Sequence, residues 1–302
     1  MIKIGTRHSA LALWQAQAVQ NTLENAQRST TLVEVSSQGD QDQDTPLHQF
    51  GTTGIFTKAL DDALRQKQID VAVHSLKDYP TDIPEDFTLA AVLPRGPHQD
   101  IIAYKGTGAF LKDKSSQAVI ATGSIRRKAQ WLQRYPQHEI VGLRGNVQTR
   151  LRKLSDSDWH GAIFAKAGLE RVDLLPPQFR ILSWMLPAPA QGVVGIMCRS
   201  SDHKLSDFLK TINHSETFML AQIERQFLNT VEGGCSAPVG ALAQIKNKNI
   251  HLSAGVFSLN GKEKATANKK VALPQAFDIG IKAAQEVLKN GGREIMNALK
   301  NE

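Results

Sequence analysis

The sequence has few cysteines, few aromatic residues and no long apolar run. Its two cysteines, Cys198 and Cys235, lie in different surroundings and do not suggest a disulfide framework. No segment approaches the roughly 18 apolar residues needed to span a membrane, and the first residues lack the apolar core of a signal peptide. These absences argue against membrane and disulfide-rich secreted proteins, and they favour the reducing cytoplasm.

Several common catalytic motifs are also missing. The sequence contains no metal-binding cluster of cysteine and histidine, no phosphate-binding loop of the Walker A type and no Gly-x-Ser-x-Gly motif. It therefore gives no reason to expect a metal ion or a nicotinamide cofactor.

The charge balance is basic, with 36 Lys and Arg against 29 Asp and Glu, a net charge of +7. Such a balance suits a nucleic acid, an anionic surface or a small polyanion. Proteins that bind nucleic acid tend to have lysine-rich runs and aromatic residues for stacking. Here aromatic residues make up only 6%, and the arginines of interest lie where strands lead into helices. This pattern favours a pocket for carboxylates or phosphates.

The length of 302 residues predicts two or three domains, and the order of elements predicts an α/β protein. Two blocks alternate strands and helices, which predicts mostly parallel sheets. Pro187, Pro189 and Gln191 mark a segment that crosses between the blocks. After about residue 213 the pattern changes to a small α+β domain. Expected strands in the two blocks are 2–5, 32–36, 69–73, 118–121, 139–143 and 161–165. Expected helices there run from Ser9 to about 25, from Thr53 to 66, over 125–134 and over 147–154. The last domain should contain a helix over 216–229, strands over 239–245, 250–258 and 264–272, and a closing helix over 274–289 that ends at Gly291.

Arginines recur at three turns between a strand and a helix. The turns are Thr6-Arg7-His8-Ser9, Thr122-Gly123-Ser124-Ile125-Arg126-Arg127 and Leu143-Arg144-Gly145-Asn146, with Arg150 about one helical turn further on. Helix N-termini attract anions, and arginine can bind a carboxylate through two hydrogen bonds. Cations at this end of a helix oppose its dipole, so their repetition indicates a function. The alternative is a set of solvated surface arginines.

An acidic residue follows one of the buried strands, in His74-Ser75-Leu76-Lys77-Asp78-Tyr79-Pro80. Active groups in α/β folds lie at the carboxyl ends of strands. Among the cationic turns, Asp78 is a candidate acid–base group or a stabiliser of positive charge. The alternative is an ordinary turn residue before proline.

Cys235 lies in the glycine-rich segment Val-Glu-Gly-Gly-Cys-Ser-Ala-Pro-Val-Gly, residues 231–240. Glycines before it allow a sharp turn that can present the thiol. Cys198, by contrast, ends an apolar run. The alternative for Cys235 is a small buried residue.

Together these segments resemble hydroxymethylbilane synthase, also called porphobilinogen deaminase, and the resemblance runs nearly end to end. The matching motifs are Thr-Arg-x-Ser-x-Leu-Ala-Leu-Trp-Gln from residue 6, His-Ser-Leu-Lys-Asp from 74, Gly-Ser-Ile-Arg-Arg from 123, Leu-Arg-Gly-Asn-Val-x-Thr-Arg-Leu from 143, Leu-Pro-Ala-Pro-Ala-Gln-Gly from 186 and Glu-Gly-Gly-Cys from 232.

The resemblance implies two hinged α/β domains like those of periplasmic binding proteins, and a small α+β C-terminal domain that contains Cys235. The boundaries we expect are 1–93 with 190–213 for the first domain, 94–189 for the second and 214–302 for the third.

The resemblance also implies a transferase of tetrapyrrole and heme biosynthesis. Its dipyrromethane cofactor would be attached to Cys235 through a thioether. Four porphobilinogen units would be joined head to tail on this primer with loss of ammonia, and water would then release hydroxymethylbilane. A cytoplasmic monomer without nucleic-acid or membrane partners is the corresponding expectation.

Site residues follow from the same resemblance. Asp78 would be catalytic, stabilising positive charge on a pyrrole nitrogen as ammonia leaves, and Lys77 would help to hold the cofactor. Cofactor binding is assigned to Cys235, Ser75, Lys77, Asp78, Thr122, Ser124, Arg126, Arg127, Arg144, Gly145 and Arg150. Substrate binding is assigned to Arg7, Ser9, Gln15, Arg144 and Arg150.

The chain departs from the family pattern at four positions. Gln49 and Thr53 stand where lysines are frequent, Gly123 where serine is common, and Gln38 where arginine is common. Since none is Asp78 or Cys235, we expect altered substrate affinity with the activity kept.

Two other interpretations fit part of the sequence. A two-lobed receptor for a small anion would explain the arginines but would leave Asp78 and the Cys235 segment without a role. A nucleic-acid-binding protein would fit the basic charge, but this sequence lacks the aromatic residues and lysine runs typical of that class.

Overall fold

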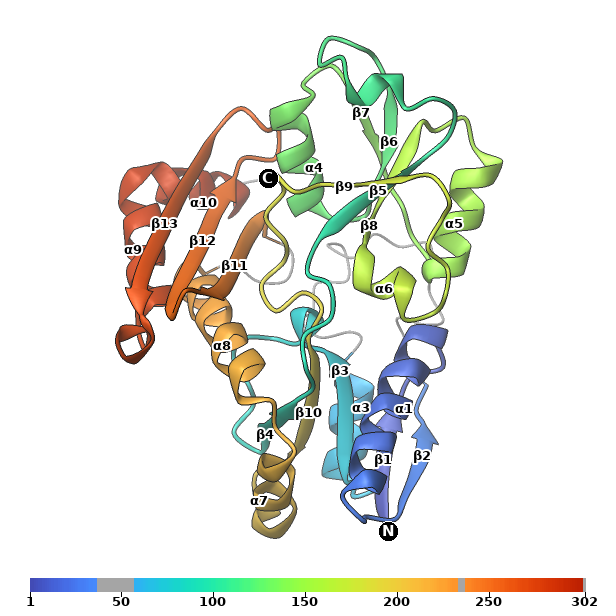
Figure 1. The fold of residues 1–302 in the computed structure, drawn as a ribbon, viewed down its shortest axis with the longest axis vertical. Coiled ribbons are helices and arrows are strands. Elements are labelled where there is room, and N and C mark those ends of the chain that lie inside the picture. Colours follow the sequence, from blue (N-terminus) through green and yellow to red (C-terminus); the bar gives the residue numbers. More distant parts are fainter. Residues whose placement is uncertain (37–56, 233–236, 301–302) are drawn as a thin grey trace. The chain divides into compact units, whose positions relative to one another are not determined.

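The computed structural model describes residues 1–36, 57–232 and 237–300 (Figure 1). The chain divides into two compact units. The first comprises Met1–Gly96 and Gly192–Met219, and the second comprises Pro97–Gln191 and Leu220–Glu302. Among the described residues, no helix is long and apolar enough to cross a bilayer.

The first unit is built on a mixed sheet with the order β2-β1-β3-β10-β4. β1 runs parallel to β2 and β3, whereas β10 is antiparallel to both β3 and β4. The chain therefore returns to this sheet after the second block. Strands are β1 (Ile2–Thr6), β2 (Thr30–Glu34), β3 (Val71–Ser75), β4 (Phe87–Val92) and β10 (Val194–Arg199). Helices are α1 (Ala10–Asn25), α3 (Lys58–Arg65), α7 (His203–Thr211) and the 3-10 helix η2 (Leu76–Asp78).

Both faces of this sheet are packed against other parts of the chain. Successive residues of a strand point to opposite faces, so one strand can contribute to both. Ile4 packs with Val19 and Leu23 of α1 on one face. Gly5 faces the other way, where a Cβ would lie 2.2 Å from Ile69. The absence of a side chain at position 5 therefore lets the chain after α3 approach the sheet closely.

The second unit contains a sheet with the order β7-β6-β8-β5-β9, in which β6 is parallel to β7 and β8. β5 is antiparallel to β8 and β9. The elements are β5 (Asp100–Tyr104), η3 (Ala109–Leu111), β6 (Val119–Ala121), α4 (Ile125–Arg134), β7 (Glu139–Val141), α5 (Val147–Asp156), β8 (Gly161–Ala165), α6 (Lys166–Glu170) and β9 (Phe179–Ile181).

This sheet also has apolar packing on both faces. Ile102, Ile120 and Ile163 pack with Trp131 of α4. The neighbouring residues along each strand pack on the opposite side with Leu154 of α5. The sheet is therefore buried between helices.

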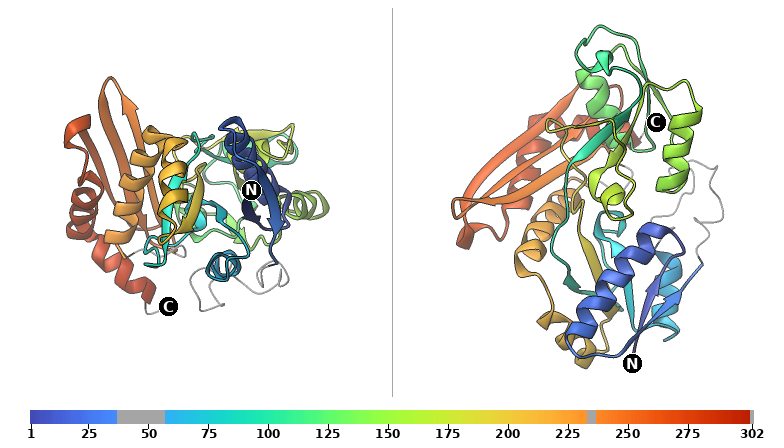
Figure 2. Two further views of the ribbon diagram at one scale, coloured as in Figure 1. Left: turned by 90° about the horizontal axis from the view of Figure 1, so that it is seen from below. Right: turned by 45° about the vertical axis from the view of Figure 1, so that its right-hand side comes forward.

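The C-terminal part of the second unit is an antiparallel sheet, β11-β12-β13, with α9 along one face (Figure 2). α8 precedes this sheet, and Gly280 of α9 packs so closely on α8 that a Cβ would lie 2.2 Å from the Ile223 carbonyl oxygen. The elements are α8 (Ser215–Thr230), β11 (Val239–Lys246), β12 (Asn249–Phe257), β13 (Lys264–Ala272), η4 (Leu273–Gln275), α9 (Ile279–Val287), η5 (Leu288–Gly292) and α10 (Arg293–Lys300).

The predicted α/β class with a small α+β C-terminal part is confirmed, and α4 and β8 match the expected ranges. Two expectations were wrong, and four strands were missed. Both large sheets are mixed, because β10 and β5 run against their neighbours. Strands β4, β5, β9 and β10 were not expected. The closing helix is followed by α10 after a turn in which Gly291 has φ 95°. The domain boundaries stay a prediction.

Candidate active site

The first unit places two of the predicted turns at one edge of its sheet. β1 and β3 are parallel and pair directly, so their carboxyl ends lie together. Arg7 follows β1, and Ser75 is the last residue of β3. Ser9 begins α1, and its hydroxyl accepts a hydrogen bond from the Ala12 N–H at 3.3 Å. Ser9 thus serves as the predicted helix cap.

Gln15 links these two turns. Its side chain is buried, and Nε2 donates a hydrogen bond to Ser75 Oγ at 2.7 Å. Because Ser75 leads directly into Lys77 and Asp78, this bond fixes α1 against the start of the Asp78 turn. Gln15, which we assigned to substrate binding, is therefore in contact with Ser75, which we assigned to cofactor binding.

Asp78 is the last residue of η2, the short turn after β3. Leu76 and Tyr79 on either side are buried, whereas the Asp78 side chain is exposed and Lys77 is half-buried. Apolar neighbours therefore anchor the turn while the carboxylate reaches solvent. This is the placement that a group acting on a ligand requires.

A buried polar cluster of Asp61, His74 and Tyr79 lies behind this turn. The Tyr79 hydroxyl donates to Asp61 Oδ1 at 3.3 Å, and the His74 and Tyr79 rings are 4.9 Å apart. Burial raises the pKa of Asp61 to about 6, against the opposing effect of the Tyr79 hydrogen bond. Burial, and then the positive charge of Arg7, lower the pKa of His74 to about 3. His74 is therefore neutral near pH 7.

In the second unit, the turn before α4 combines hydroxyl caps with a close approach. Ser124 Oγ accepts from the Arg127 N–H at 3.5 Å, and Thr122 Oγ1 accepts from the Ser124 N–H at 3.2 Å. A Cβ at Gly123 would lie 2.5 Å from the Leu143 carbonyl oxygen. Glycine at this position therefore lets the two cationic turns of this unit lie side by side.

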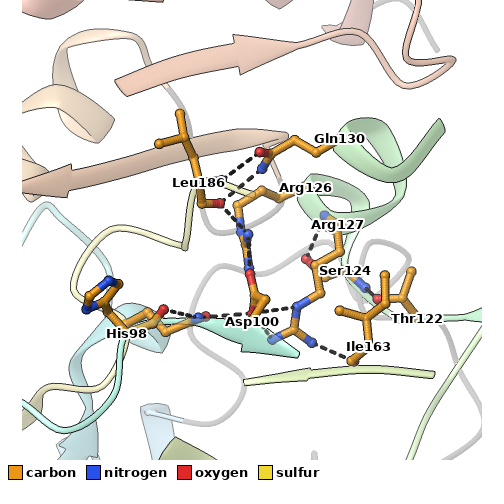
Figure 3. Close-up of polar contacts among 10 residues, drawn as sticks. His98, Asp100, Thr122, Ser124, Arg126, Arg127, Gln130, Ile163 and Leu186 are labelled. Atoms are coloured by element: carbon orange, nitrogen blue, oxygen red, sulfur yellow. Dashed lines mark hydrogen bonds and ion pairs between the residues drawn. The ribbon is translucent and has the colours of Figure 1, made fainter. Parts of the chain in front are cut away.

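Arg126 and Arg127 both bind Asp100, the first residue of β5 (Figure 3). Arg126 Nη1 lies 2.7 Å from Asp100 Oδ2, and Arg127 Nη2 lies 2.9 Å from Oδ1. Arg126 also donates to the Leu186 carbonyl at 2.6 Å, and Arg127 to the Ile163 carbonyl at 3.0 Å. Burial alone would raise the pKa of Asp100, but the two guanidinium groups lower it to about 2.

This cluster has a structural role that the sequence motifs did not predict. Asp100 is fully buried, and the two arginines are 4% and 6% exposed. A sequence signal existed, since paired cations in the first turn of a helix need an acidic partner and Asp100 opens an apolar strand. Binding of a pyrrole carboxylate by these arginines stays a prediction.

The second cationic turn follows β7. Gly145 has φ 106°, a left-handed conformation suited to glycine. Asn146 caps α5, and its Oδ1 accepts from the Thr149 N–H at 2.9 Å. Arg144 precedes this cap, and its buried Nε has no hydrogen-bond partner among the described residues. Arg150 lies in the first turns of α5. Arg144 thus keeps a donor for a ligand.

The structure describes one of the two cysteines. Cys198 lies in β10 and is fully buried, and burial raises the pKa of its thiol to about 11. It is therefore unreactive as a nucleophile. Cys235 lies outside the described residues, as do Gln38, Gln49 and Thr53.

Sequence comparison assigns the family. A family model described as the dipyrromethane cofactor-binding domain of porphobilinogen deaminase matches residues 2–207, and the model of the C-terminal domain matches residues 218–289. The chain belongs to the porphobilinogen deaminase family. It is accordingly an enzyme, a transferase of tetrapyrrole biosynthesis with a dipyrromethane cofactor. The resemblance seen in the sequence is thereby confirmed.

Relatives of this family match over almost the whole chain. Porphobilinogen deaminase of Desulforamulus reducens is 37% identical over 303 residues, 99% of this chain and 98% of the relative. The chloroplastic porphobilinogen deaminase of Oryza sativa is 38% identical over 304 residues, 98% of this chain and 83% of the relative.

Similarity to solved structures is weaker, and one of the structures found is a periplasmic domain. The VFT2 domain of Bordetella pertussis BvgS has a TM-score of 0.42 at 11% identity, covering 70% of this chain and 86% of that one.

Among the described residues of this porphobilinogen deaminase family member, no group of acidic, histidine and cysteine side chains could hold a metal ion.

Proposed function

We propose that this chain joins four porphobilinogen units head to tail on a dipyrromethane primer attached to Cys235, and that water then releases hydroxymethylbilane. The observation that carries the proposal is the match of both family domains, in order, along one chain. Asp78 and the cationic turns, which lie in the family motifs, would supply the chemistry.

The donor groups of the second unit fit a cofactor rich in carboxylates. Arg144 has a buried Nε without a partner among the described residues, and the adjoining turns present hydroxyls at helix N-termini. Thr122, Ser124, Arg126, Arg127, Arg144, Gly145 and Arg150 would hold acetate and propionate groups. When bound, the dipyrromethane supplies the pyrrole carbon to which the first substrate unit is joined.

Asp78 would act on the substrate. Its exposed carboxylate would stabilise the positive charge that develops on the substrate's pyrrole nitrogen as ammonia leaves, and it could accept the proton lost on coupling. Lys77 would pair with a cofactor carboxylate. Arg7 and Ser9, at the neighbouring turn, would bind substrate carboxylates, with Gln15 holding the two turns together.

The remaining features follow from this assignment. A thiol that must react is kept reduced in the cytoplasm, which is the compartment we propose. We also propose a monomer whose partner is the small-molecule substrate, without nucleic-acid or membrane binding.

Asp78→Asn tests the catalytic assignment. The substitution keeps the size and removes the charge, so turnover per cofactor-loaded enzyme should fall severely, by about 100-fold or more. Asp78→Glu should retain more activity. Bilane formation is the measurement, with exposed Asp82→Asn as the matched control. Turnover of Asp78→Asn at the unmutated rate would leave Asp78 as a turn residue. Binding of porphobilinogen without consumption by the unmutated protein would instead favour the two-lobed receptor.

A further inference from the structure

The segment 186–191 of the second unit is held by contacts from several elements. Gln130 of α4 binds Leu186 twice: Nε2 donates to the carbonyl at 3.0 Å, and Oε1 accepts from the N–H at 2.8 Å (Figure 3). The Gln191 side chain donates to Asp100 Oδ1 at 3.0 Å. The segment is therefore tied to the cluster that contains Arg126 and Arg127.

Glu224 binds the same segment from α8. Its side chain is 0% exposed. Oε2 accepts from the Ala190 N–H at 2.6 Å, and Oε1 accepts from the Ala243 N–H of β11 at 2.8 Å. Beside this bridge, the Ala241 N–H of β11 donates to the Pro187 carbonyl at 3.1 Å. One carboxylate thus joins α8, β11 and the 186–191 segment.

The two elements joined by Glu224 flank Cys235 in the chain. α8 ends at Thr230 and β11 begins at Val239. A fully buried carboxylate is costly unless hydrogen bonds satisfy it, so its retention here needs a reason. General packing of α8 would be served equally well by an apolar side chain.

We infer that Glu224 is a positioning residue for cofactor attachment: it sets the two ends of the Cys235 segment relative to the 186–191 segment, and through it relative to the arginines of α4. The inference rests on the proposed role of Cys235. It predicts that loosening this junction slows formation of the covalent adduct even where the protein stays folded.

Glu224→Gln tests the inference with little change in size. The new amide can accept from only one of the two N–H groups, and its NH₂ must face the other. Full-length apoprotein is incubated with porphobilinogen, and the gain of two pyrrole units is followed by intact mass. Loss of such a hydrogen bond should slow adduct formation by about tenfold or more. Urea unfolding gives the stability of each variant.

Gln130→Met removes the contacts that α4 makes with the same segment, and it provides the test if Glu224→Gln does not fold. This variant should also slow adduct formation. Because both side chains act through one segment, the double variant should be slowed by less than the product of the single effects. Val287→Ala, a core truncation in α9, is the stability-matched control and should load at the unmutated rate.

The outcomes separate the two claims. Glu224 would only support the fold if Glu224→Gln formed the covalent adduct at the unmutated rate. The same conclusion would follow if adduct formation slowed in proportion to lost stability in both Glu224→Gln and Val287→Ala. If the unmutated protein gains no mass at Cys235, the proposed anchor fails, and this inference fails with it.

Discussion

At the scale of single residues, burial decides what each charged group can do. Asp78 is exposed in a turn that the buried Leu76 and Tyr79 hold in place. Asp100 is enclosed, and its charge serves to hold Arg126 and Arg127. Motifs in the sequence identify the arginines but not their partner, because Asp100 is distant in the chain and belongs to a strand that the pattern did not predict.

Asp100→Asn should destabilise the protein strongly. Two buried guanidinium groups would lose their counter-charge, at a cost of about 3–5 kcal/mol. Urea unfolding at neutral pH measures the change. The control is Asp86→Asn, which breaks the exposed pair with Arg65 and should cost under about 1 kcal/mol. Equal losses in the two variants would contradict the role given to Asp100.

Arg144→Leu should separate binding from stability. Arg144 keeps a donor without a partner among the described residues, so its loss should leave the unfolding midpoint near that of the unmutated protein. Affinity for the cofactor or substrate should fall about tenfold or more, as expected for a lost charge-assisted hydrogen bond. Arg126→Leu, by contrast, should lower stability, because the buried Asp100 would keep only Arg127 as a counter-charge. Unchanged cofactor attachment and turnover in Arg144→Leu would mean that Arg144 is an ordinary solvated surface residue.

The buried His74 predicts a specific acid sensitivity. Its pKa is about 3 in the folded protein, below the ordinary value of 6.5. Between these values the unfolded chain binds a proton that the folded protein does not, so stability falls as the pH falls through this window. The groups nearest the imidazole are Arg7 and Tyr79. The nearby Asp61 has a raised pKa, so its titration makes stability rise as the pH falls, and this contribution is the same in the unmutated protein and in a His74 variant.

His74→Gln removes this titration. It should lose less stability than the unmutated protein when the pH is lowered from about 7 to about 4.5. Urea midpoints at the two pH values give the difference. A loss as large as in the unmutated protein would mean that His74 is not held neutral.

At the scale of elements, periodicity predicted those with strong local signals. α4 follows a capping serine, and its range was correct. β10 and β5 consist mostly of apolar residues, but their antiparallel pairing depends on strands far away in the chain. Local pattern cannot supply such pairing, which is why the sheets were expected to be mostly parallel.

The turn between β12 and β13 tests close packing within the second unit. Gly261 has φ 71°, and a Cβ there would lie 2.4 Å from the Gln133 backbone nitrogen at the end of α4. Gly106 has φ 67° but nothing within 4 Å. Gly106→Ala should therefore cost only the backbone strain, about 1 kcal/mol, and Gly261→Ala clearly more. Thermal or urea unfolding of both variants is the measurement. Equal costs would show that the hairpin does not need this contact.

At the scale of the whole molecule, the order of the motifs predicted the family, and both family domains match in that order. The sequence could not show that Glu224, Asp100 and Gln130 converge on the 186–191 segment, because these residues belong to no motif with a fixed spacing. Such contacts are set by tertiary packing of elements that are distant in the chain.

The intact mass of the purified protein shows directly whether a dipyrromethane is attached to Cys235. We expect an added mass of two pyrrole units on the unmutated protein and on Cys198→Ser, whose cysteine is buried in β10. We expect no added mass on Cys235→Ser. The full adduct on Cys235→Ser, or its absence from the unmutated protein after incubation with porphobilinogen, would contradict the account.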